Sequence, residues 1–125
     1  MRTWVIVASG GALGTIARHG SNIWASHRFE TSVPLATGIV NLIGCSAVGL
    51  LAGFIISGRL TMSAPVRTFV FVGVLGVFTT FSSFGLDTIT LLRGGRTGLA
   101  AANVLVQVGL GLVAVFVGLE AGAAR

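Results

Sequence analysis

The chain has 125 residues, of which 54% are hydrophobic and 9% are charged, and these few charges cannot solvate a globular domain of this size. The formal charge is +5, yet all the basic residues are arginines and most fall near the ends of apolar stretches. That placement indicates contact with lipid headgroups and argues against nucleic-acid binding. The composition therefore predicts an all-α integral membrane protein.

Four apolar stretches follow in chain order, at about residues 4–26, 34–57, 65–92 and 97–119. Each reaches the roughly 20 residues that a helix needs to cross the hydrocarbon core of a bilayer. The connections are short, so we expect neighbouring helices to pack antiparallel in a single four-span domain over residues 1–125. GxxxG spacing of Gly10 with Gly14, and of Gly49 with Gly53, predicts close helix contacts in the first two spans.

The arginines give no preferred orientation, because four fall on each side of the membrane. The N-terminus, the second connection and the C-terminus share one side, with Arg2, Arg59, Arg67 and Arg125. The first and third connections share the other side, with Arg18, Arg28, Arg93 and Arg96. Orientation normally follows an excess of basic residues in cytoplasmic loops. The balance favours insertion both ways round, with two opposed copies forming an inverted pair. A single orientation fixed by a partner or by loop details is the alternative.

Hydroxyl and aromatic residues interrupt the third span where it should be most apolar. The segment is Thr79-Thr80-Phe81-Ser82-Ser83-Phe84, inside an uncharged run from Thr68 to Leu86. Polar groups at this depth are tolerated mainly where they face protein or a water-filled cavity. The pattern predicts that this segment lines a polar path through the membrane.

Other neutral polar groups lie at similar depth in the second and fourth spans. Thr37 precedes Asn41 by one helical turn, and Asn103 precedes Gln107 by one turn, so each pair shares a face. The nearest carboxylate, Asp87, lies toward the far end of the third span and outside this set. Amides and hydroxyls donate hydrogen bonds without adding negative charge, which favours a small anion over a cation. The alternative is that these groups only bond neighbouring helices together.

Phe81 and Phe84 are three residues apart and share a helical face. The edge of a phenyl ring is positive, so two rings presented edge-on can contact an anion weakly, although simple packing explains the spacing as well. Arg18 falls where the first span should be ending. Its charge either draws anions into a vestibule or reaches the lipid interface.

No Ser-His-Asp, Cys-His or phosphate-loop arrangement is present, so we do not expect an enzyme. Two further classes remain open beside an anion path. A small multidrug-type exporter that exchanges protons for cations needs a carboxylate within a span, and the first span has none. A non-transporting membrane accessory subunit would use its glycines for packing alone.

Three segments resemble the motifs of the CrcB/Fluc fluoride channels of microbes. They are the glycine-rich first-span segment at residues 10–18, the second-span segment around Asn41 at residues 37–44, and the third-span segment at residues 73–84. The third is the most specific, and the likeness in length and span count extends over the whole chain.

The resemblance implies a passive, fluoride-selective channel that exports fluoride from the cytoplasm through the inner (plasma) membrane. It implies a third helix broken near its middle and an antiparallel, dual-topology homodimer with two separate pores. No organic cofactor is implied. By motif, the pore residues are Asn41, Phe81, Phe84, Thr37, Thr80 and Ser83, with Asn103 and Gln107 near pore positions of the fourth span. Arg18 matches the vestibule arginine. Gly76 and Thr79 match positions whose backbone carbonyls hold a central sodium ion between the two copies.

Overall fold

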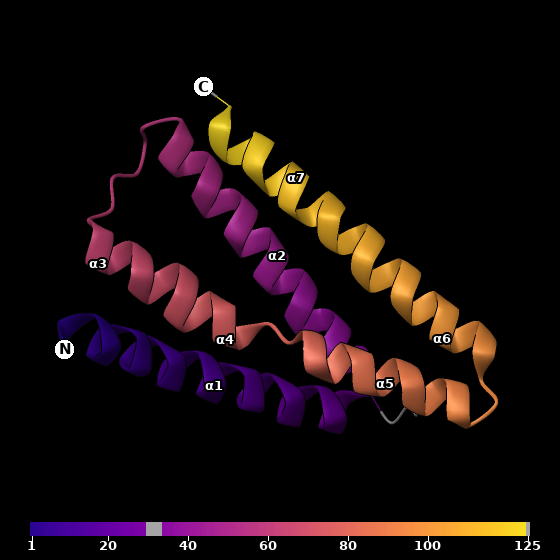
Figure 1. Ribbon diagram of the computed structural model, residues 1–125. Helices are drawn as coiled ribbons and strands as arrows, with labels where there is room; N and C mark the ends of the chain where they lie inside the picture. Colours follow the sequence, from indigo (N-terminus) through magenta and orange to yellow (C-terminus); the bar gives the residue numbers. More distant parts are fainter. Residues whose placement is uncertain (30–33, 125) are drawn as a thin grey trace.

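A computed structural model describes residues 1–29 and 34–124 of the chain (Figure 1). Every regular element in these residues is helical, which confirms the predicted all-α class. The first two helices are α1 (Arg2–Arg28) and α2 (Leu35–Ile56). The third region contains α3 (Ala64–Arg67), η1 (Thr68–Leu75), α4 (Gly76–Phe78) and α5 (Phe81–Arg93). The fourth contains α6 (Thr97–Val104), η2 (Leu105–Leu110) and α7 (Gly111–Ala123). Arg125, which enters the charge balance, lies outside the described residues.

The two segments η1 and η2 are π-helical, which the hydrophobic pattern did not predict. Each continues an α-helix without a break in the helical backbone, so the fourth region is one long rod from Thr97 to Ala123. A π-helical turn has i→i+5 hydrogen bonds and is frequent at functional sites. Gln107 lies within η2.

Three helices of the described chain are long and apolar enough to cross a membrane. They are Leu35–Ile56 with 22 residues, Ala64–Arg93 with 30 and Thr97–Ala123 with 27. They support the predicted multi-pass membrane protein. Helix α1 is also long enough, at 27 residues, but Arg18 and His19 make its second half less apolar. That α1 also crosses the bilayer stays a prediction.

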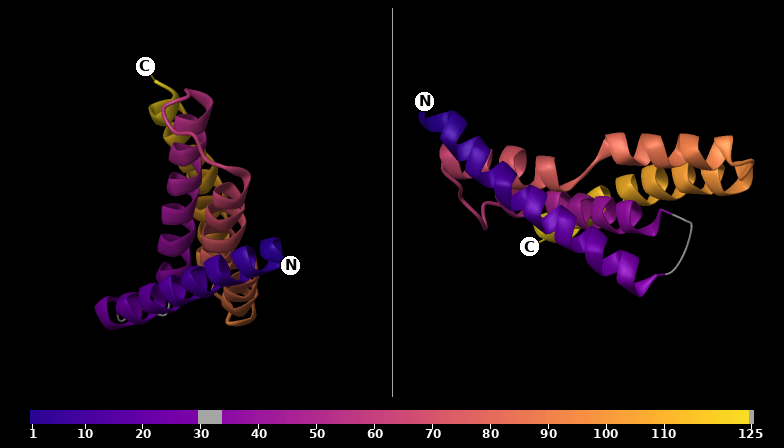
Figure 2. Two further views of the ribbon diagram at one scale, coloured as in Figure 1. Left: turned by 90° about the vertical axis from the view of Figure 1, so that its left-hand side faces the viewer. Right: turned by 90° about the horizontal axis from the view of Figure 1, so that it is seen from below.

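The helices pack in pairs that divide the third region in two. Helix α1 runs beside η1 and α4, and α2 runs beside α7 (Figure 1). After α4 the third region no longer packs against α1, and α5 lies beside α6, as the view from below makes clear (Figure 2). Thr79 and Thr80, between α4 and α5, therefore lie where the packing partner of the third region changes from α1 to α6.

Glycines allow the backbones of these pairs to touch, as the GxxxG spacing predicted. A Cβ atom on Gly10 would lie 2.7 Å from the Phe69 carbonyl oxygen of η1. A Cβ atom on Gly49 would lie 2.9 Å from the Cα of Val115, and one on Gly53 would lie 2.8 Å from the Cα of Gly122. All three distances are shorter than real Cβ contacts, so only glycine fits at these close helix contacts.

Gly49→Ala should destabilise the protein by about 1–3 kcal/mol, because the new methyl group meets the α7 backbone and the seam must open. The matched control is Gly98→Ala, since a Cβ there meets nothing within 4 Å. Thermal unfolding in detergent, followed by circular dichroism, measures the difference. Equal unfolding midpoints for the two variants would contradict the packing described above.

Candidate functional site

The backbone between α4 and α5 is extended at two residues. Thr79 has φ −75° and ψ 157°, and Thr80 has φ −148° and ψ 109°. In a continuous helix the Thr80 N–H would donate to the Gly76 carbonyl. Here it donates instead to Asn41 Oδ1 at 2.8 Å. The Ser83 N–H likewise donates to Thr80 Oγ1 at 3.2 Å, so Thr80 is the N-cap of α5.

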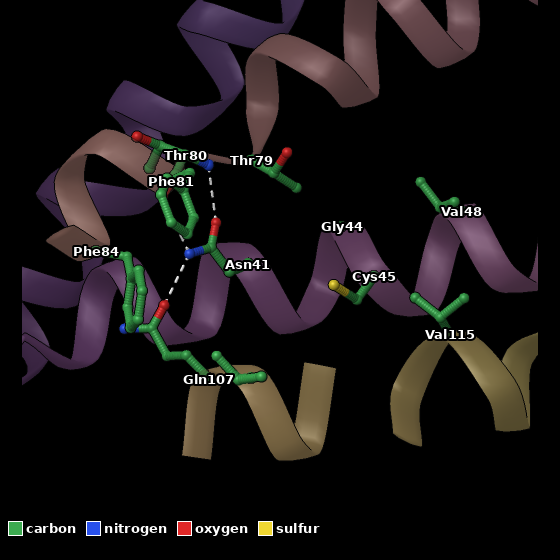
Figure 3. Close-up of a pocket in the computed structure, with 11 residues that line it drawn as sticks. Asn41, Gly44, Cys45, Val48, Thr79, Thr80, Phe81, Phe84, Gln107 and Val115 are labelled. Carbon is green, nitrogen blue, oxygen red and sulfur yellow. Dashed lines mark hydrogen bonds between the residues drawn. The ribbon is translucent and has the colours of Figure 1, made fainter. Parts of the chain in front are cut away.

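Asn41 of α2 satisfies both backbone groups of Thr80. Its Oδ1 accepts from the Thr80 N–H, and its Nδ2 donates to the Thr80 carbonyl at 3.2 Å. The same Nδ2 donates to Gln107 Oε1 at 2.8 Å (Figure 3). Both hydrogens of the Asn41 amide are thus bonded to protein oxygens. The predicted residue Asn41 therefore sits at the junction of α2, η2 and the extended residues.

The fourth region adds a second pair of amides to this junction. Gln107 is buried, with 9% of its surface exposed, and its Nε2 donates to Asn103 Oδ1 at 2.8 Å. Asn103 Nδ2 donates to Thr88 Oγ1 at 2.9 Å, and that hydroxyl donates to the Phe84 carbonyl at 2.8 Å. The sequence singled out both amides but not Thr88. The available signal was that Thr88 lies one turn after Phe84 on α5.

Hydroxyl groups gather at the start of α5. Thr80 is buried, and its Oγ1 donates to Ser83 Oγ at 3.0 Å and lies 3.3 Å from Ser82 Oγ. Ser83 is half-buried and Ser82 is exposed. The structure therefore brings the predicted residues Thr80 and Ser83 together, beside the backbone groups of Thr80 that bond to Asn41.

A cavity of about 290 Å³ opens beside these groups. Polar and aromatic groups form one side of it, from Asn41, Thr80, Phe81, Phe84 and Gln107. Gly44, Cys45, Val48 and Val115 are among the residues that form its less polar side (Figure 3). The predicted aromatic and amide residues thus line one shared cavity.

The two phenylalanines differ in exposure. Their ring centroids lie 5.5 Å apart at an interplanar angle of 48°, which is a tilted pair. Phe84 is half-buried, whereas 82% of the surface of Phe81 is exposed. A large apolar ring that the chain itself leaves uncovered is available for contact with another surface.

Thr37 corrects the expectation that no carboxylate accompanies the polar groups. Its hydroxyl donates to Asp87 Oδ2 at 2.8 Å, so the carboxylate lies against α2 one turn from Asn41. Asp87 is four residues after Ser83, which places both on one face of α5, but the spacing alone does not show that this face meets Thr37. The sequence placed Asp87 toward the far end of the third span and did not predict its bond to Thr37.

The carbonyls of Gly76 and Thr79 lose their helical donors. The Thr80 N–H goes to Asn41, and the Ser83 N–H goes to the Thr80 side chain. In residues 1–29 and 34–124, no group of three His, Cys, Asp or Glu side chains is placed to hold a metal ion. Unwound backbone carbonyls are oxygen ligands that cations accept in other membrane proteins.

Arg18 lies apart from the polar cluster. It is half-buried on α1, one turn after Gly14, whose Cα packs against the backbone of η1 and α4. It is not among the residues that line the cavity of about 290 Å³. Its proposed vestibule position is therefore separate from the contacts of Asn41.

Together these observations define a class: a multi-pass helical membrane protein in which neutral polar side chains from three regions meet beside an open cavity. The family model of the CrcB-like proteins, described as Camphor Resistance (CrcB), matches residues 5–119. The chain belongs to the CrcB family.

Several curated relatives resemble nearly the whole chain. A Fluoride-specific ion channel FluC of Chloroflexus aurantiacus is 43% identical over 122 residues, covering 98% of this chain and 96% of the relative. The FluC of Methylobacillus flagellatus is 42% identical over 117 residues, covering 93% and 91%. FluC 2 of Symbiobacterium thermophilum is 45% identical over 113 residues, covering 90% of each chain.

Thr80→Val should destabilise the protein by about 1 kcal/mol, because the Ser83 N–H loses its N-cap acceptor while the side-chain volume is kept. Thr80→Ser keeps the hydroxyl and should stay close to the parent. Unfolding by increasing denaturing detergent, followed by near-ultraviolet circular dichroism, compares the three proteins. A stability for Thr80→Val equal to that of Thr80→Ser would refute the capping role.

Proposed function

We propose that the chain is a fluoride-selective, passive ion channel that exports fluoride from the cytoplasm across the inner membrane. The observation that carries the proposal is the cavity lined by Asn41, Thr80, Gln107 and two phenyl rings. Amides and hydroxyls can replace water around a small anion without a competing negative charge. The relatives described above are named as fluoride-specific ion channels, and none of these names favours a multidrug exporter or an accessory subunit.

The proposed pore follows the polar face of α5. It contains Asn41, Phe81, Phe84, Thr80 and Ser83, with Thr37 beside Asp87 at one end. Gln107 and Asn103 complete the polar lining from the fourth region. The bonds between these groups support the proposal, because an anion can take over donors that already point into a common space. Arg18 would raise the local anion concentration from a vestibule.

We propose further that two copies associate antiparallel, giving a dual-topology homodimer with two pores. Two observations support this arrangement. The arginines are balanced across the membrane, and Phe81 leaves 82% of its surface uncovered by its own chain. An opposed copy would cover that ring and close the open side of the cavity. Inverted pairing also matches the inverted repeats of many transporters.

A sodium ion between the two copies is the third part of the proposal. Gly76 and Thr79 carbonyls have lost their helical donors to side chains, and unwound backbone carbonyls are ligands that sodium accepts in membrane proteins. The residues therefore fit the ion. Sodium would supply positive charge at the dimer centre and hold the extended residues of both copies together.

Purified protein in liposomes should release fluoride and retain chloride, as measured with ion-selective electrodes after a potassium ionophore is added. Phe81→Ile and Asn41→Asp should each lower fluoride efflux about tenfold or more, because the first removes a ring edge and the second adds a negative charge. Val113→Ile, at an exposed position away from the cavity, is the control. Equal passage of chloride, or no fluoride release by the parent, would overturn the function.

Dual insertion predicts that any loop residue is found on both sides of the membrane. In a Cys45→Ser background, Thr61→Cys places a single thiol in the connection between α2 and α3. About half of these thiols should react with an impermeant maleimide from outside intact vesicles, since opposed copies are equally numerous. Labelling near none or near all would show one orientation and contradict the antiparallel dimer.

A further inference from the structure

An amide beside an anion path is useful in only one of its two orientations. With Nδ2 toward the path, Asn41 donates to an anion, whereas with Oδ1 toward the path it repels one. The two orientations have almost the same shape, so packing does not choose between them. Hydrogen-bond partners must make the choice, and they form a directed series in this chain.

One end of the series is a group that can only donate. The Thr80 backbone N–H lies 2.8 Å from Asn41 and requires an acceptor there, so that atom must be Oδ1. The Asn41 nitrogen then faces Gln107 at 2.8 Å, which obliges Gln107 to present Oε1. Gln107 is an amide too, so its nitrogen then faces the next member of the series.

The other end of the series is a group that can only accept. Gln107 Nε2 donates to Asn103 Oδ1, and Asn103 Nδ2 donates to the Thr88 hydroxyl. Thr88 in turn donates to the Phe84 backbone carbonyl at 2.8 Å. A flip of any single amide would place two donors or two acceptors face to face. The Thr80 N–H therefore leaves one orientation that satisfies every amide, and each further bond in the series raises the cost of a flip.

We propose that Gln107, Asn103 and Thr88 are positioning residues that hold the Asn41 nitrogen in its donating orientation. They act through Asn41, and the role rests on the proposed fluoride conduction because it explains how that site discriminates charge. Thr80 and Phe84 supply the two fixed ends from the backbone. The weaker 3.2 Å bond from Nδ2 to the Thr80 carbonyl is then the one that an arriving anion replaces.

The NMR signals of the side-chain amides allow a direct test of this positioning role. The sequence contains four side-chain carboxamides, those of Asn22, Asn41, Asn103 and Gln107. In ¹⁵N-labelled protein in detergent, hydrogen exchange of the Asn41 amide should be about tenfold faster in Gln107→Met than in the parent. Leu105→Met, on the exposed face of η2, should leave it unchanged. Asn22 is exposed on α1 and serves as the internal reference.

Thr88 separates positioning from packing, because it does not touch Asn41. Thr88→Val keeps the volume and removes the hydroxyl, whereas Thr88→Ser keeps the hydroxyl and removes a methyl group. Positioning predicts that Thr88→Val speeds Asn41 amide exchange and lowers fluoride efflux about fivefold, while Thr88→Ser stays within about twofold of the parent. A packing role predicts the opposite ranking and would overturn the proposal.

The two readouts keep this proposal distinct from the proposed function. Faster Asn41 exchange in Gln107→Met and Thr88→Val supports positioning even if the parent releases no fluoride, a result that would reject the channel alone. Unchanged Asn41 exchange in both variants rejects positioning, whatever the fluoride efflux.

Discussion

The pairing of the Asn41 side chain with the Thr80 backbone is the interaction on which the rest of the structure depends. A non-helical residue inside a membrane span exposes an N–H and a carbonyl, and each costs several kcal/mol in hydrocarbon if it is left unpaired. Asn41 satisfies both groups of Thr80 from a neighbouring helix. Because that demand is met, the chain can leave α1 after α4 and continue beside α6 as α5. The same two residues create the capped helix start on which Ser83 and both phenyl rings are arranged.

Asn41 reaches this position because α2 is held by small residues on two sides. Gly49 and Gly53 admit the backbone of α7, which fixes the depth of α2 against the fourth region. Gly44, one turn after Asn41, faces the Thr79 side chain so closely that a Cβ atom would collide with it. The glycines that look like generic packing motifs therefore set the distance across which the amide bonds are made. The cavity and the close helix contacts at these glycines are therefore parts of one arrangement.

Much of this arrangement could be predicted from residue type and spacing. Apolar stretches gave the helical class, GxxxG spacing gave the seams, and the unusual polarity of residues 79–84 located the cluster. The π-helical turns could not be predicted, since they depend on how η1 and η2 fit their neighbours and not on local composition. The Thr37–Asp87 bond was missed for a different reason. It follows from the register between α2 and α5, which becomes known only once Asn41 and Thr80 are paired.

The direction of the amide series is even harder to predict from the sequence. Asparagine and glutamine each carry a donor and an acceptor, so their presence on facing helices predicts bonding without predicting which atom faces which. A single backbone N–H, released where Thr79 and Thr80 are extended, sets the orientation of the Asn41 amide, and the bonds that continue through Gln107 and Asn103 hold it there. Every buried side-chain nitrogen and oxygen in the described residues has a partner. In the proposed channel, an anion would enter by exchanging one existing bond for another, which would keep its binding weak enough for the ion to leave.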